Sequence, residues 1–172
     1  MAYGVVRTDN MYGTDVRAGL VSVKYVVTSG SGNDITKTET AIENGNVLKL
    51  GGLIDGEREI YEGSAPAANT DLKDVVLIAS PEVMYDEHKH NLDEYINEAG
   101  KACRGYRLHT GDIFSVTADA LTGTPEVGNI VELAASTKMK TAASATNGST
   151  GVGKIIAKDV VGRHTYYAIL VG

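Results

Sequence analysis

Seven residues near the C-terminus match a known phosphate-binding pattern. The run Gly148–Lys154 has the spacing of the first seven positions of a P-loop. A working P-loop then needs Ser or Thr to hold magnesium, with a strand before it and a helix after it. Here Ile155 follows, residues 142–147 are not an apolar strand, and residues 155–157 are typical of a strand. The sequence therefore favours a glycine-rich loop over a nucleotide site.

A second cluster gathers side chains that bind metals. Residues 86–90 read Asp-Glu-His-Lys-His. The two histidines, His88 and His90, share a face only if the segment is extended, because they lie two residues apart. A metal site needs further ligands, which the sequence does not supply nearby, and Lys89 adds an unfavourable charge. We therefore expect a polar loop and no metal.

The single cysteine is the third candidate. Cys103 could act as a nucleophile with His109, but no third group is apparent to orient such a pair. A cysteine at the end of an apolar stripe is more typical of a small core residue. A lone thiol forms no internal disulfide, so we expect synthesis in a reducing cytoplasm. Together these patterns predict a protein without enzymatic activity, cofactor or metal.

Charge is unevenly distributed along the chain. The net charge of the 172 residues is −6, and 42% of them are hydrophobic. Residues 34–98 contain 15 acidic and 5 basic side chains, which leaves 7 acidic and 11 basic side chains elsewhere. This pattern indicates either an acidic solvated face or a protein oriented by its charge on another surface. No basic patch interleaved with aromatic residues predicts nucleic-acid binding, and no run of about 20 apolar residues predicts a membrane span.

Most of the chain has the patterns of short strands. Alternation and turn residues predict strands near 20–28, 35–42, 47–50, 59–61, 75–79, 106–109, 112–118, 127–133, 154–161 and 165–171. The continuous apolar run 75–79 is expected to be buried on both faces. Asn44-Gly45, Thr110-Gly111 and Gly162-Arg163 are expected to close hairpins between flanking strands. The low-complexity stretch 134–153 is predicted to be a long exposed loop.

The predicted fold is mainly β, a barrel or sandwich of short antiparallel strands with one short helix at about 91–103. Asn91 is the expected N-cap of that helix, and Gly100 the expected stop. Residues 1–19 are apolar without a clear period, so they are either an extended arm that docks on a partner or a first strand of the core. We therefore expect an arm over 1–19 and a β-rich domain over 20–172, either as one barrel or as two subdomains at about 20–103 and 104–172.

Three stretches of the sequence resemble capsid decoration (cement) proteins of tailed bacteriophages. They are residues 42–52, which contain Glu43-Asn44-Gly45-Asn46; residues 76–83, which contain Ala79-Ser80-Pro81; and residues 98–116, which contain Arg104-Gly105-Tyr106 and Gly111-Asp112-Ile113. The resemblance consists of turn residues and alternating apolar positions over most of the chain.

The resemblance implies a virion protein on the outer capsid surface, synthesised in the bacterial host cytoplasm. It implies binding to the major capsid protein and self-association, most often as a trimer. It also implies an N-terminal arm that contacts the capsid, for which we select Tyr3, Val5, Arg7 and Tyr12. The alternatives are another phage component, such as a head fibre base, neck or tail protein, and a carbohydrate-binding β-sandwich module.

Overall fold

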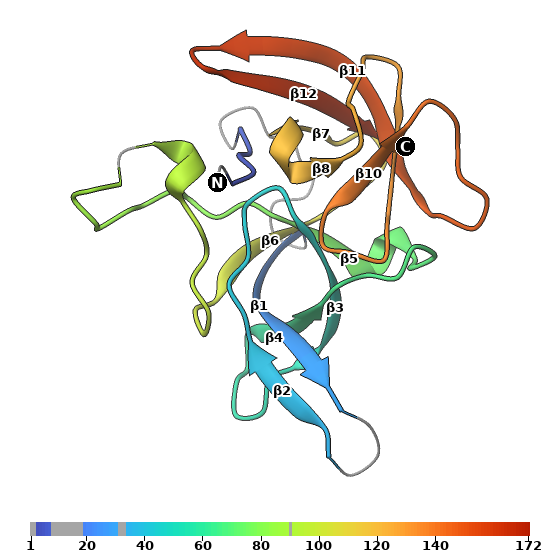
Figure 1. Cartoon of the computed structure of the whole chain (residues 1–172). Coiled ribbons are helices and arrows are strands. Elements are labelled where there is room, and N and C mark those ends of the chain that lie inside the picture. Colours follow the sequence, from blue (N-terminus) through green and yellow to red (C-terminus); the bar gives the residue numbers. More distant parts are fainter. Residues whose placement is uncertain (1–2, 8–18, 31–33, 90) are drawn as a thin grey trace.

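The computed structural model describes residues 3–7, 19–30, 34–89 and 91–172 (Figure 1). It is mainly β, as the sequence predicts, with a closed five-stranded barrel and a second, curled sheet. The strands are β1 (Leu20–Ser29), β2 (Thr36–Glu39), β3 (Val47–Leu53), β4 (Ile60–Ser64), β5 (Val75–Ile78), β6 (Cys103–Arg107), β7 (Ile113–Thr117), β8 (Leu121–Thr122), β9 (Ile130–Glu132), β10 (Met139–Ala142), β11 (Gly151–Val161) and β12 (His164–Val171). Among the described residues, the 3₁₀ turns η2 (Leu72–Asp74), η3 (Leu92–Glu94) and η4 (Ala118–Ala120) accompany them. No helix in the described part of the chain is long and apolar enough to cross a membrane.

The barrel closes through its first strand. The order is β1-β4-β3-β5-β6, and β6 returns to pair with β1, while β2 adds to β1 alone. The β1–β4 pair is parallel and the β1–β6 pair is antiparallel. Two small residues allow the narrow barrel to close, since a Cβ on Gly63 would lie 2.6 Å from Val23 Cγ2 and one on Gly105 would lie 3.0 Å from Val76 Cγ2.

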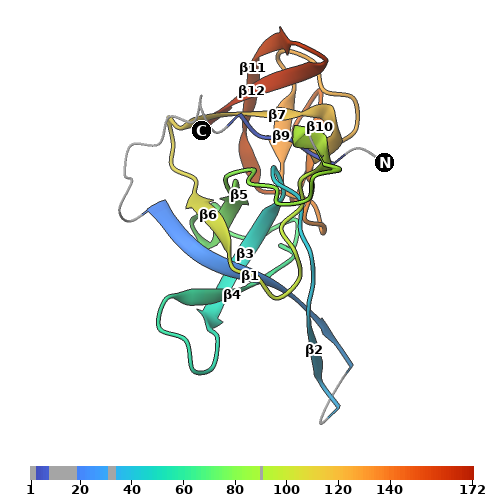
Figure 2. The same ribbon diagram turned by 90° about the vertical axis from the view of Figure 1, so that its left-hand side faces the viewer.

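The second sheet has the order β7-β12-β11-β9-β10-β8 and stacks on one side of the barrel (Figure 2). The strand β5 is buried on both faces, as its continuous apolar run predicts. Val76 and Ile78 belong to the barrel interior, and Val75 and Leu77 belong to a larger cluster shared with the second sheet. The two sheets therefore share one core, which includes Phe114 and Ile169.

Two of the three predicted hairpins are wrong, although all three turns form. Gly45 and Gly111 have positive φ, as their turns require. The strands on either side nevertheless pair elsewhere: β2 pairs with β1, β3 with β4 and β5, and β6 and β7 lie in different sheets. Only Gly162-Arg163 closes a hairpin between its neighbours, β11 and β12. Turn chemistry is local, whereas the choice of partner strand depends on the whole core.

The predicted helix over 91–103 is reduced to the turn η3. Its start is as expected, because the Asn91 N–H donates to Glu94 Oε2 at 2.9 Å. The chain then leaves the helix: Asn97 forms a backbone bridge with Ile42, and Cys103 already lies in β6 opposite Val23. A helix of this length depends on packing against the rest of the protein for its stability. Here the segment pairs with strands instead of continuing as a helix. Gly100 has positive φ in the turn that leads into β6.

The stretch 134–153 is not a continuous exposed loop, contrary to the prediction. It contains β10, which pairs with β8 and β9. Met139 on this strand is fully buried. Met139 and Val152, both fully buried, anchor the segment to the core.

Candidate functional site

The N-terminal segment is part of the folded body over residues 3–7. Val6 forms a bridge with Val116 of β7, and the Thr117 N–H donates to the Val5 carbonyl at 3.0 Å. Val5 and Val6 are 1% and 2% exposed. For these residues the structure matches the second explanation of the terminus, a first strand of the core.

The four predicted contact residues are therefore placed differently from one another. Val5 is buried in the chain's own core, so it contacts another protein only if the segment leaves β7. Tyr3 and Arg7 are partly exposed. The Tyr3 N–H donates to the Asp93 carbonyl, and the Arg7 guanidinium lies 5.7 Å from the centre of the Tyr166 ring. Tyr12 lies outside the described residues.

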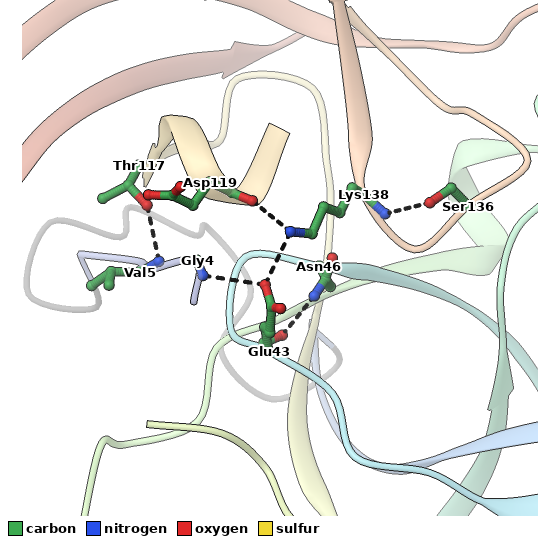
Figure 3. A network of polar contacts seen from close by, with 8 residues as sticks. All are labelled: Gly4, Val5, Glu43, Asn46, Thr117, Asp119, Ser136 and Lys138. Carbon is green, nitrogen blue, oxygen red and sulfur yellow. Dashed lines mark hydrogen bonds and ion pairs between the residues drawn. The ribbon is translucent and has the colours of Figure 1, made fainter. Parts of the chain in front are cut away.

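A network of polar contacts fastens this segment to both sheets (Figure 3). The Glu43 carboxylate accepts from the Gly4 N–H at 3.2 Å and pairs with Lys138 Nζ at 3.3 Å. Lys138 also donates to the Asp119 carbonyl at 2.8 Å, and Val5 N–H donates to Thr117 Oγ1 at 3.1 Å. The network thus joins the N-terminus, the turn before β3 and the segment before β10. Its evident role is to hold these elements together.

A pocket of about 730 Å³ opens between β1 and the long connection from β5 to β6. It is lined by parts of 20–22, 80–89, 94–98 and 101–104. The apolar side chains of Leu20, Val83 and Met84 share it with Tyr85 and Tyr95. Its volume suits a small ligand or the side chain of a partner.

Buried amide side chains support the floor of this pocket. Asn44 Nδ2 donates to the Ser80 carbonyl at 2.8 Å, and the Ser80 N–H donates back to Asn44 Oδ1 at 3.0 Å. Asn97 Nδ2 donates to the Ile42 carbonyl and to Asn44 Oδ1. The Tyr95 hydroxyl donates to Asn97 Oδ1 at 3.2 Å, and burial raises the pKa of Tyr95, which keeps this donor protonated. These satisfied bonds fix the connection in one shape.

Cys103 also lines the pocket, but as an inert thiol. Its Sγ donates to the Val23 carbonyl at 3.0 Å, and burial raises its pKa from 9.0 to about 11. His109 Nδ1 instead lies 3.6 Å from Asp112 Oδ2. Cys103 and His109 therefore have separate partners, and the proposed nucleophile and base are not arranged as a pair.

Alkylation should measure this difference in the thiol. At pH 8 we expect iodoacetamide to label native Cys103 about 100-fold more slowly than the same cysteine in denaturant, because a two-unit rise in pKa lowers the thiolate fraction by that factor. Since the folded pKa is the higher one, the stability from the neutral thiol is present below pH 9 and is lost as the pH rises toward 11. Fast labelling of the native protein with a midpoint near pH 8 would restore the nucleophile hypothesis.

The other two sequence motifs do not form sites. The P-loop-like run ends in the first residues of β11, so a strand follows it where a P-loop requires a helix. In the metal-like run, His88 lies in a turn and its N–H donates to Asp86 Oδ1, while His90 lies outside the described residues. Within residues 3–7, 19–30, 34–89 and 91–172, no three His, Cys, Asp or Glu side chains are grouped as metal ligands.

Strand β11 also exposes an apolar edge, which the sequence analysis did not identify. In the distal half of β11, Val160 is 71% exposed and Ile156 and Val161 are partly exposed. The only sequence signal was the run Ile-Ile-Ala-Lys-Asp-Val-Val at 155–161, with one charged pair between apolar residues.

Comparison with protein-family models, curated proteins and solved structures gives no match to this chain.

Proposed function

We propose that this chain is a non-enzymatic structural protein of a tailed-phage virion. In this proposal it binds the outer surface of the capsid and stabilises contacts between neighbouring major capsid subunits. It associates with further copies of itself, with a trimer as the expected state. A protein in this role works through surface area and shape, with many weak contacts acting together across a lattice.

The observation that carries the proposal is that the three stretches resembling head proteins meet in one part of the fold. The Gly45 N–H from the first stretch donates to the Ile78 carbonyl in the second at 2.8 Å. The Ala79 N–H in the second donates to the Arg104 carbonyl in the third at 3.0 Å. The turns and apolar positions on which the resemblance rests therefore belong to a single packed unit of this chain.

The distribution of charge gives additional support. The barrel and the β5–β6 connection carry the acidic region 34–98, whereas residues 112–172, which form the second sheet, balance five acidic side chains with five basic ones. Lys138, Lys140, Lys154, Lys158 and Arg163 all lie on or beside its strands. Such a separation orients a protein on a charged lattice and suppresses wrong arrangements.

Copy number in purified particles tests the proposal directly. We expect mass spectrometry of virus particles from the source of this sequence to find about one copy of the chain per major capsid subunit, or a simple fraction of that. A handful of copies per particle would instead indicate a neck, tail or head fibre protein. Absence from the particle would contradict every virion role.

The pocket favours a second candidate, a carbohydrate-binding module. Tyr85 is 94% exposed at the pocket, and Tyr95, Asn97 and Glu98 also line it. Aromatic rings with planar polar side chains suit the apolar faces and hydroxyl groups of sugars. Saturable binding of a purified polysaccharide that is lost in Tyr85→Ala would favour this function over capsid binding.

A further inference from the structure

The distal half of β11 has an open outer edge. β11 pairs with β12 along nearly its whole length, but with β9 only between Gly151 and Lys154. The last backbone contact on that side is made by Ile155, with Gly128 and Asn129. Beyond it, no described residue pairs with the outer edge of 156–161, and β11 is the outermost strand of the hairpin (Figure 1).

This edge is largely apolar, unlike the edge strand β2 of the first sheet. The edge strand β2 consists of Thr, Lys, Thr and Glu, and all four residues are exposed. Charged and polar residues of this kind are the usual protection of an edge strand against pairing. Ile156, Val160 and Val161 are instead the exposed apolar residues of β11, and only Lys158 and Asp159 interrupt them. An edge whose charged residues are confined to one central pair, with exposed apolar residues on both sides, is suited to accept another strand.

The turn fixes which backbone groups point outward. Gly162 has φ of +60° as the first of two turn residues, which matches a type II′ hairpin, and Val161 lies opposite His164. In such a turn these two flanking residues bond to each other. Because alternate residues point their backbone groups to the same edge, the N–H and C=O of Val160 and Lys158 point to the open side.

We propose that this edge, residues 156–161, receives an extended antiparallel strand from another protein. The strand has a basic residue opposite Asp159, an acidic residue opposite Lys158, and apolar or β-branched residues on both sides of this charged pair. Opposite charges directly across two strands stabilise the pair, and β-branched residues pack well there. The added strand comes from a major capsid subunit. In naming this source, the inference rests on the proposed function.

The charge pattern disfavours a second copy of this chain as the occupant. Two copies that meet through the same edge can pair even-numbered residues only with even-numbered residues, because of the alternation described above. Lys158 therefore never lies opposite Asp159. The two symmetric registers with the longest overlap are centred on Lys158 or on Asp159, and each places like charges directly opposite, which is destabilising.

A proline substitution tests the edge. Val160→Pro removes an N–H that faces the open side while leaving the bonds to β12, and edge strands tolerate proline at such positions. Val160→Thr is the matched control, since it keeps both the N–H and the β-branched shape. Against capsids assembled without this protein, we expect Val160→Pro to bind about tenfold more weakly and Val160→Thr to bind like the unchanged protein. Circular dichroism checks that both variants fold.

A synthetic strand separates the failure of this inference from failure of the proposed function. The probe is the blocked peptide Val-Thr-Arg-Glu-Val-Thr, and its control exchanges the two charged residues. We expect the first peptide to shift the amide NMR signals of Lys158 and Val160 at several-fold lower concentration than the control. Equal NMR shifts with both peptides, or no shift with either peptide, would overturn the inference. If the protein distinguishes the two peptides but does not bind capsids, the inference about the edge stands and the proposed capsid function fails. If the unchanged protein and Val160→Pro bind capsids equally well, the capsid function stands and the inference about the edge fails.

Discussion

Removal of residues 1–7 is expected to lower the free energy of unfolding by about 3–6 kcal/mol, the value for burying two valine side chains. Val5 and Val6 are almost fully buried, and Val6 packs in the core cluster shared by the two sheets. The truncation also removes the Gly4 N–H from the Glu43 carboxylate and leaves the edge of β7 unpaired. Thermal unfolding should show a fall in Tm of roughly 10 °C or more.

A pair of point substitutions separates core packing from other effects of truncation. Val6→Ala is expected to cost about 2 kcal/mol, from lost apolar burial and an incompletely collapsed cavity. Val127→Ala makes the same chemical change at a side chain that is 56% exposed, and should change stability by less than about 0.5 kcal/mol. If the truncated protein instead kept its full stability and only lost attachment to a partner, the segment would be a docking arm and its placement against β7 would be incidental.

The strands with strong local signals could be predicted from the sequence. β1 shows period-two alternation, β5 is a short continuous apolar run, and the β11–β12 hairpin has a glycine at the position where a II′ turn needs one. These signals depend on residues within about ten positions of one another. They place individual elements and the mainly-β class correctly.

The pairing of these strands could not be predicted in the same way. Asn44-Gly45 has the sequence of a hairpin turn, yet Asn44 and Asn46 are both buried, and the Asn46 carbonyl accepts from the Ile78 N–H at 2.8 Å. The Asn44 side chain bonds to the backbone of Ser80, 36 positions away, and the barrel closes by pairing β1 with β6. Nothing within the turn itself identifies these distant partners.

The predicted helix failed for a related reason. The apolar residues at helical spacing in this segment are Leu92, Tyr95, Ile96 and Ala99, but the buried residue within 91–102 is Asn97, which this pattern omits. Leu92 itself is exposed. Asn97 is buried because it completes the amide network under the pocket, so a polar residue outside the periodic pattern determines the local structure. The pocket arises from this non-local arrangement.

Substitution of Gly153 by alanine is expected to destabilise the protein by about 2–3 kcal/mol, a typical cost of forcing extra atoms into a packed site. A Cβ at this position would lie 2.0 Å from the Leu170 carbonyl oxygen, where strand β11 passes close to β12. Backbone cannot move aside as the tip of a side chain does, so the pairing of the two strands must shift. Thermal unfolding should show a Tm lower by roughly 4–12 °C.

Gly151 provides the matched control on the same strand, because a Cβ there meets nothing within 4 Å. Gly151→Ala should leave Tm unchanged or raise it slightly, since alanine restricts the unfolded chain. Both glycines belong to the P-loop-like run, so the pair also tests what that run is for. If Gly153 serves close strand packing, its substitution changes stability, and ATP with magnesium does not shift the Tm of the unchanged protein. A Tm raised by ATP and lost in Gly151→Ala would instead show that the glycine-rich run binds phosphate despite the strand that follows it.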